Sequence, residues 1–190
     1  GINVTAPHKV EVMKYIDVIT DGAKKLGSVN TVVNRDGKLY GYNTDADGFC
    51  MALTKAGIEI ENSRILIIGA GGVVRPTLIR LIDNKPKSIT VVNRTKSKAK
   101  TLAEDILKST GFEVNTEIDK LEFDIVINTT SAGMEPQENV MPIENIEEIN
   151  DLSFINENTA AVDMIYNPDK PLLLQEAEKR GAKLPNGLGL

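Results

Sequence analysis

The chain has 190 residues and a formal net charge of −5, from 22 Lys or Arg and 27 Asp or Glu. This acidic balance excludes a general nucleic-acid binder, which needs a basic surface to neutralise phosphates, but it allows a local basic pocket. Apolar residues make up 41% of the chain, which is enough for a globular core and too many for a disordered protein.

The first part of the chain predicts short strands and helices joined by turns. The predicted strands are residues 1–5, 29–34 and 38–41, and the predicted helices are residues 10–16, 17–25 and 44–56. Arg35-Asp36-Gly37 separates two apolar runs, a pattern typical of a β-hairpin. Asn43-Thr44-Asp45 offers capping side chains for the last of these helices, and Gly27 and Gly57 are expected helix ends.

From Arg64 onward the pattern changes to buried strands that alternate with helices. The predicted strands are residues 65–68, 88–92, 112–115, 124–128 and 160–164; the predicted helices run from the glycines to about residue 82, over 96–108 and over 171–180. Residues 134–159 are acidic, rich in Asn and without a clear period. Alternating strands and helices form βαβ units, so we expect an α/β fold with a doubly wound parallel sheet of the Rossmann type.

Gly69-Ala70-Gly71 follows an apolar strand and opens a predicted helix. Glycines permit a tight turn close to a pyrophosphate, and a helix N-terminus offers free N–H groups and the positive end of the helix dipole. We therefore expect a dinucleotide site here, and the alternative is a plain strand-turn-helix connection. Val74 stands where a small residue usually allows close helix–strand packing, and Pro76 lies near the end of the first turn, where its missing N–H begins to matter.

The end of the next strand distinguishes the two nicotinamide cofactors. NAD enzymes usually place Asp or Glu there, and that carboxylate would repel a 2′-phosphate. This chain has Asn93-Arg94-Thr95 instead, in which Arg94 can pair with a phosphate and Thr95 can donate its hydroxyl. Three further cations follow, namely Lys96, Lys98 and Lys100. An exposed helix face is the simpler explanation for the first and last of these, but the stretch as a whole predicts NADP.

Reduction of a ketone by hydride transfer needs a proton donor near the carbonyl oxygen. The only histidine, His8, is a poor candidate, because a single His in a loop is usually a surface residue. Lys9 is better placed, since the preceding strand and Pro7 restrict its segment, and a Lys beside a carboxylate can shuttle protons when burial lowers its pKa. Asp45 is the natural partner, but spacing alone leaves open whether the two side chains meet.

Seven segments, in chain order, carry a family resemblance. They are Asn3-Val4-Thr5-Ala6-Pro7-His8-Lys9, Gly27-Ser28-Val29-Asn30-Thr31, Asn43-Thr44-Asp45, Gly69-Ala70-Gly71-Gly72, Asn93-Arg94-Thr95, Asn128-Thr129-Thr130-Ser131-Ala132-Gly133-Met134 and Asp163-Met164-Ile165-Tyr166-Asn167-Pro168. Together they resemble the shikimate/quinate dehydrogenase family along essentially the whole chain. The resemblance implies an oxidoreductase that reversibly reduces 3-dehydroshikimate to shikimate with NADPH, a step of chorismate and aromatic amino-acid biosynthesis.

The resemblance also implies roles for individual residues. Lys9 matches the catalytic lysine, and Asp45 matches the carboxylate that works with it and binds substrate hydroxyls. The further substrate-binding positions are Thr5, Asn30 and Tyr166. The cofactor-binding positions are Gly69, Ala70, Gly71, Gly72 and Val73 at the pyrophosphate, Asn93, Arg94, Thr95 and Lys98 at the 2′-phosphate, and Met164 and Gly187 near the nicotinamide.

Two further cofactor assignments have ordinary alternatives. Asp21 falls at an acidic position that is sometimes assigned to cofactor contact, although an acid on a helix surface is the simpler interpretation. Thr130, next to Ser131, follows the fourth strand of the predicted parallel sheet and is expected to line the cofactor groove, the alternative being a capped strand end.

The resemblance predicts three parts. Residues 1–58 are a smaller α/β substrate domain that lacks its start, residues 59–167 are the NADP-binding domain, and residues 168–190 return toward the substrate domain and lack their end. Family members begin before Gly1 with a serine pair for the substrate carboxylate, and they continue past Leu190 to a substrate-binding glutamine. We therefore expect a piece of a longer protein, with little turnover of its own. Two alternatives stay open: an NADP-binding relative without turnover, and a quinate/shikimate dehydrogenase that prefers NAD.

Composition also limits the partners. The longest near-apolar run, residues 65–74, has ten residues and three glycines, so it is too short to span a bilayer. A single cysteine, Cys50, excludes an internal disulfide and a cysteine-based metal cluster, and this usage fits a reducing compartment. We expect a cytoplasmic protein that acts on a small molecule, with no metal, membrane or nucleic-acid partner, and we leave a homodimer open.

Overall fold

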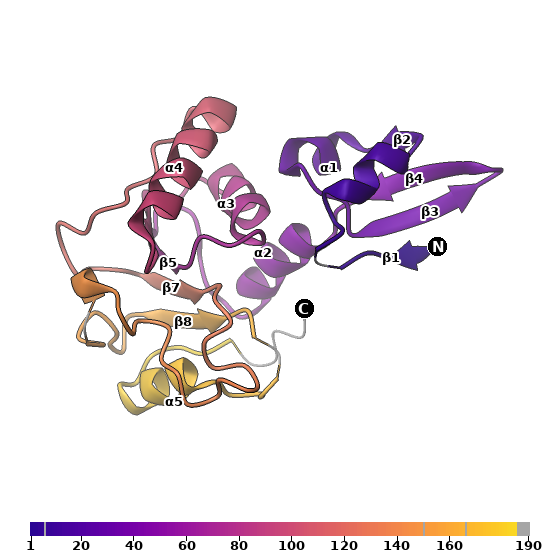
Figure 1. Cartoon of the computed structure of the whole chain (residues 1–190). Helices are drawn as coiled ribbons and strands as arrows, with labels where there is room; N and C mark the ends of the chain where they lie inside the picture. The colour runs from indigo at the N-terminus through magenta and orange to yellow at the C-terminus, as the bar shows by residue number, and fades with distance from the viewer. Residues whose placement is uncertain (6, 150, 166, 186–190) are drawn as a thin grey trace.

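The computed structural model describes residues 1–5, 7–149, 151–165 and 167–185. These residues form two four-stranded sheets, a smaller one near the N-terminus and a larger one in the rest of the chain (Figure 1). No helix in the described part of the chain is both long enough and apolar enough to cross a bilayer.

The smaller sheet has the strand order β1-β3-β4-β2. Its strands are β1 (Ile2–Asn3), β2 (Val18–Ile19), β3 (Thr31–Arg35) and β4 (Lys38–Tyr42). β1, β3 and β4 pair antiparallel, whereas β2 pairs parallel with β4. Between β3 and β4, Asp36 and Gly37 both have positive φ, 51° and 84°, as a two-residue hairpin turn requires. The hairpin predicted from this dipeptide is therefore confirmed.

One expectation for this region is wrong, because residues 17–25 are not a single helix. Val18 and Ile19 form β2, and α1 (Asp21–Leu26) begins only after them. β-branched residues favour extended backbone, and Thr20 then caps the helix with its side-chain oxygen. The helix expected over residues 10–16 is a short 3₁₀ helix, η1 (Glu11–Tyr15).

The larger sheet has the order β6-β5-β7-β8, and all of its strand pairs are parallel. Its strands are β5 (Arg64–Ile68), β6 (Ser88–Val92), β7 (Ile125–Asn128) and β8 (Ala160–Asp163). Single parallel bridges extend it at both edges, between Thr90 and Asn115 and between Ala160 and Lys183. The strand expected over residues 112–115 is thus reduced to one bridge, while the predicted parallel sheet is confirmed.

Helices cover both faces of the larger sheet (Figure 1). α2 (Asp45–Lys55), α3 (Val74–Asp83) and α4 (Lys96–Thr110) pack on one face, and α5 (Leu172–Lys179) packs on the other. Along β5, Ile65 and Ile67 join the core under the first three helices, whereas Leu66 and Ile68 join the core under α5. This period of two, with both faces buried, confirms a doubly wound sheet of the Rossmann type.

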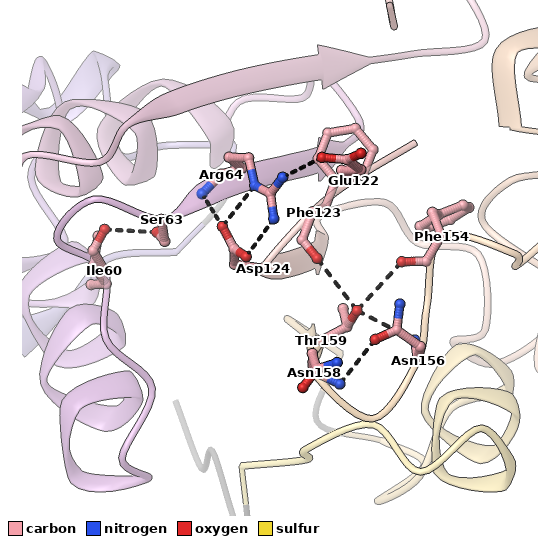
Figure 2. Close-up of polar contacts among 10 residues, drawn as sticks. All are labelled: Ile60, Ser63, Arg64, Glu122, Phe123, Asp124, Phe154, Asn156, Asn158 and Thr159. Carbon is pink, nitrogen blue, oxygen red and sulfur yellow. Dashed lines mark hydrogen bonds and ion pairs between the residues drawn. The ribbon is translucent and has the colours of Figure 1, made fainter. Parts of the chain in front are cut away.

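The segment without a clear sequence period completes the second face. Its buried apolar residues are Ile143, Ile146, Ile149, Leu152, Phe154 and Ile155, and it contains a second 3₁₀ helix, η2 (Glu147–Ile149). The segment ends at Thr159, a fully buried residue whose hydroxyl lies 3.3 Å from the carbonyl oxygen of Phe123 (Figure 2). Irregular backbone therefore supplies part of the core here.

At the amino end of the larger sheet, Arg64 joins β5 to the residues that precede β7 (Figure 2). The backbone N–H and Nε of Arg64 donate to Oδ2 of Asp124 at 2.7 and 3.0 Å, and Nη2 donates to Oδ1 at 2.9 Å. Nη1 donates to Glu122 at 2.6 Å. The guanidinium holds the pKa of Asp124 below its usual range. Because this cluster lies at the opposite end of the strands from the glycine turn, we assign it to stability.

α2 connects the two sheets. The sequence predicts α2 as part of the substrate domain, residues 1–58. Its Phe49 and Leu53, however, are fully buried in the same core as β5 and α3 of the larger sheet. The boundary between residues 58 and 59 stays a prediction.

Candidate functional site

Two charged residues that are 36 positions apart meet where α2 begins. Nζ of Lys9 lies 2.5 Å from Oδ2 of Asp45, the first residue of α2. The Lys9 side chain is 26% exposed and that of Asp45 is 53% exposed, so the ion pair is open on one side. The contact that sequence spacing left open is therefore present.

Asn30 holds this carboxylate in place. Asn30 is only 7% exposed, and its Nδ2 donates to Oδ1 of Asp45 at 2.5 Å and to the hydroxyl of Thr44 at 3.0 Å. Its Oδ1 accepts the backbone N–H of Thr44 at 3.0 Å. A buried amide that is bonded on both sides has one orientation, so it fixes the start of α2 and the Asp45 side chain together.

Backbone hydrogen bonds place Lys9 and Thr5 beside this cluster. The N–H of Val29 donates to the carbonyl of Lys9 at 2.8 Å, and the N–H of Val4 donates to the carbonyl of Asn30 at 2.7 Å. Thr5 follows Val4 directly and is exposed. The segment that carries Thr5 and Lys9 is thus hydrogen-bonded to Val29 and Asn30.

The cluster has the chemistry of a proton-transfer site. An amine held by a carboxylate can give a proton to an oxygen placed beside it, or take one from it. The two oxygens of Asp45 have about four lone pairs between them, so the carboxylate can accept further hydrogen bonds from a hydroxylated ligand. His8 is exposed and forms no side-chain hydrogen bond among the described residues, in agreement with a surface role.

The glycine turn lies at the carboxyl end of β5. Gly69 has φ of +117°, and a Cβ at this position would lie 2.5 Å from Oγ1 of Thr129 and 2.9 Å from Cγ2 of Thr130. Only glycine fits both the backbone conformation and the space. Gly71 and Gly72 are exposed, and a Cβ on either would meet no described atom within 4 Å. The turn is therefore close-packed on one side and open on the side that a cofactor would occupy.

The helix that follows is suited to bind an anion. α3 begins at Val74, and no described side chain caps its N-terminus. Pro76 is the third residue of α3, a position whose N–H has no partner within a helix, so the proline costs no hydrogen bond. Val74 is fully buried in the core. Neither of the two departures noted in the sequence disturbs the turn.

The stretch after β6 separates its cations into two groups. Lys96 lies 2.7 Å from Glu148, and Lys100 lies 3.8 Å from Glu117. Arg94 and Lys98 are exposed and have no acidic partner among the described residues. The helix-face explanation therefore fits the paired lysines, while Arg94 and Lys98 have the free charge that a phosphate needs.

An open hollow lies between this stretch and the glycine turn. It is lined by Ala70, Ser97, Lys98, Thr101, Leu102 and Asp105. Asn93 holds the loop of residues 93–95, which precedes α4, because its Nδ2 donates to the carbonyl of Thr95 at 2.9 Å. Ala70, Lys98 and the 93–95 loop thus belong to one end of the sheet.

Thr130 lies at the same end, in a loop organised by a buried pair that sequence reasoning missed. Asn128 donates to Oδ2 of Asp163 at 2.9 Å across β7 and β8, and its Oδ1 accepts from the backbone and hydroxyl of Thr130 at 3.0 and 2.8 Å. Oδ1 of Asp163 accepts the N–H of Ile165 at 2.9 Å. Burial raises the pKa of Asp163 to about 6. The only sequence signal was two polar residues at the ends of apolar strands.

Of the remaining assigned residues, Met164 lies beside the Thr130 loop, whereas Asp21 lies on the surface of α1. Met164 directly follows β8, and its N–H donates to the carbonyl of Asn128 at 3.0 Å, which places it beside the Thr130 loop. Asp21 is fully exposed in the first turn of α1, and its only ion pair among the described residues is with Lys24 of the same helix. Tyr166 and Gly187 lie outside the described residues.

Comparison with known proteins gives one consistent result. The sequence model of shikimate / quinate 5-dehydrogenase matches residues 51–167, and that of the shikimate dehydrogenase substrate binding domain matches residues 1–32. The chain is 42% identical over 195 residues to shikimate dehydrogenase (NADP(+)) of Geobacillus sp. (strain WCH70), and the match covers 100% of the chain and 68% of the relative.

Solved structures agree. The chain is similar to a crystal structure of shikimate dehydrogenase in complex with NADP+, with a TM-score of 0.85 and 39% identity over 98% of the chain and 65% of that protein. It is also similar to shikimate 5-dehydrogenase from Thermus thermophilus in complex with NADP(H) and shikimate, with a TM-score of 0.80 and 31% identity over 97% of the chain and 66% of that protein. The chain thus spans about two thirds of the length of these relatives.

Proposed function

Because the chain belongs to the shikimate/quinate dehydrogenase family, we propose that it catalyses the NADP-dependent interconversion of 3-dehydroshikimate and shikimate. The observation that carries the proposal is the contact of Lys9 with Asp45, oriented by buried Asn30. This contact supplies the proton donor and hydroxyl acceptor that reduction of a hydroxylated ketone needs.

We propose the following roles in the reaction. Bound NADP supplies the hydride acceptor, at C4 of its nicotinamide. In oxidation, the neutral amine of Lys9 takes the proton from the substrate hydroxyl whose carbon loses the hydride, so that a C=O bond forms. In reduction, the ammonium of Lys9 returns the proton to the forming alkoxide. Asp45 orients Lys9 and accepts a hydrogen bond from a neighbouring hydroxyl of the substrate. Thr5 and Tyr166 make further contacts with the substrate.

The residues present fit NADP. The open face of the glycine turn and the uncapped start of α3 fit a pyrophosphate, and the free cations of Arg94 and Lys98 fit a 2′-phosphate. The proposed cofactor contacts are Gly69, Ala70, Gly71, Gly72, Val73, Asn93, Arg94, Thr95, Lys98, Thr130, Met164, Gly187 and Asp21. A carboxylate that would repel the 2′-phosphate is absent from the Asn93-Arg94-Thr95 loop.

The test is an assay of shikimate-dependent NADP+ reduction, run on the chain and on the complete product of its gene. In the complete product we expect turnover with shikimate and NADP+ that far exceeds turnover with quinate or with NAD+, and in the chain alone we expect NADP binding with little turnover. NADP binding without turnover in the complete product would favour a binding protein, and faster turnover with quinate and NAD+ would favour the other branch of the family. A cytoplasmic location stays a prediction, to be checked by localisation in cells, and a homodimer stays open, to be checked by light scattering.

A further inference from the structure

Arg75 lies on α3, and its side chain contacts two other helices, α4 and α1. It is the second residue of α3, directly after the glycine turn, and its side chain is partly exposed. Its Nε donates to Oδ2 of Asp105 on α4 at 2.6 Å, and its Nη1 donates to the backbone carbonyl of Leu26 at 2.9 Å. Leu26 is the last residue of α1, a helix that contacts β4 of the smaller sheet, while the Leu26 side chain is buried in the core of the larger sheet. One guanidinium therefore joins the cofactor end of the larger sheet to the smaller sheet.

The approach of Arg75 to Leu26 depends on the residue that follows. The last carbonyls of a helix have no partner within the helix, so the carbonyl of Leu26 is available to an external donor. Gly27 has φ of +70°, and a Cβ there would lie 3.0 Å from Nη1 of Arg75. Glycine at this position thus ends the helix and also leaves room for the guanidinium.

A short buried strip connects this contact to the catalytic cluster. Leu26, Ser28, Val29 and Asn30 are each at most 7% exposed. The N–H of Val29 donates to the carbonyl of Lys9, and Asn30 donates to Asp45. The strip is tightly packed and bonded along its length, so a displacement at Leu26 is passed on to the residues that hold Lys9 and Asp45.

We propose that Arg75 is a positioning residue that sets the distance and angle between the Lys9–Asp45 pair and the cofactor. The kinetic part of this proposal rests on the proposed function. Substrate held by the smaller sheet and nicotinamide held by the larger one react only if they approach correctly, and a misplacement of about 1 Å can cost about 100-fold in rate. The ion pair of Lys25 with Asp83, at 2.6 Å, also joins α1 to α3, but at the last residue of α3, whereas Arg75 lies in the first turn of α3, next to the glycine turn.

The kinetic test uses the complete gene product with charge-balanced variants. Arg75→Met combined with Asp105→Asn removes both charges of the Arg75–Asp105 ion pair, so the net charge around the hollow beside Lys98 is unchanged. We expect kcat to fall about 10- to 100-fold while the Kd values for NADP and for shikimate each stay within about twofold. Arg75→Lys should recover part of the loss, because an ammonium can reach Leu26 but not both partners at once. Arg180→Met is the matched control, since its partner Glu176 lies one turn away on α5, far from both sites, and it should leave kcat within about twofold.

Hydrogen exchange gives a readout that is independent of activity. In the double variant, the amides of Ser28 and Val29 should exchange at least tenfold faster, whereas those of Gly69 and Val91 should be unchanged. Unchanged kcat and unchanged exchange would overturn the proposal, as would a loss of rate that comes only from weaker NADP binding. Global unfolding of both the double variant and Arg75→Lys would also overturn it, in favour of a purely structural role. If the wild type fails to oxidise shikimate, the proposed function fails, while the exchange data still decide whether Arg75 holds the strip.

Discussion

Replacing Gly69 with alanine is expected to destabilise the fold, whereas the same change at Gly71 is not. At Gly69 an alanine would have to adopt φ of +117°, and a strained backbone of this kind costs about 1–3 kcal/mol. Its Cβ would also lie 2.5 Å from Oγ1 of Thr129, and overpacking costs about 1–3 kcal/mol. Thr129 cannot move freely, because its N–H and its hydroxyl both donate to the carbonyl of Ile68, at 2.9 and 2.8 Å. The two costs together give about 2–6 kcal/mol.

Urea unfolding of the two variants measures this difference directly. Gly69→Ala should lower the midpoint at an unchanged m-value. Gly71→Ala should unfold within about 0.5 kcal/mol of the wild type, the usual range for surface changes, because a Cβ there meets no described atom within 4 Å. Gly71→Ala should nevertheless weaken the binding of NADP, because its Cβ would enter the open space that is assigned to the pyrophosphate. Equal stability of Gly69→Ala and Gly71→Ala would refute the close packing of the turn against Thr129.

Three further predictions concern charge. Arg94→Ala should lower the affinity for NADP more than tenfold and the affinity for NAD far less, because a charge-assisted hydrogen bond contributes about 1.5–3 kcal/mol. Equal losses of affinity for both cofactors in calorimetric titrations would contradict the 2′-phosphate assignment. The pKa of Asp163 is raised to about 6 by burial, so the folded state binds more protons than the unfolded state and stability should fall as pH rises from about 4 to about 6, by up to about 3 kcal/mol. Asp163→Asn should abolish that slope in urea titrations, and a slope that persists would contradict it. The pKa of Asp124 is lowered by Arg64, so this pair should stabilise the fold above the ordinary carboxyl pKa and lose its effect as pH falls, and Arg64→Met should flatten the acid side of the stability profile.

Features set by neighbouring residues were predictable from the sequence. The hairpin at Asp36-Gly37 follows from the turn chemistry of two residues, and the buried strand before Gly69 follows from its unbroken apolar run. Both depend on interactions within a few positions along the chain. The residues of the Lys9–Asp45 pair were also found, but their contact spans 36 positions, so it required the structure.

Features set by tertiary contacts were not predictable in this way. β2 has two residues and exists because β4 lies beside it, so local spacing favoured a helix instead. The partners of Arg75 are 30 and 49 positions away, and those of Asn128 include one 35 positions away. The buried residues of the 143–155 segment follow no period, because irregular backbone presents side chains to the sheet at uneven intervals.

Replacement of Lys9 tests the central claim most directly. Lys9→Ala in the complete gene product should lower kcat for shikimate oxidation about 100- to 10,000-fold, the range typical of a positioned acid or base. NADP affinity, measured by titration on the same sample, should stay within about twofold, because no described residue that is proposed to bind the cofactor bonds to the Lys9 side chain. A variant with near-normal kcat would contradict the assignment of Lys9 as the proton donor, and with it the proposed chemistry of the site.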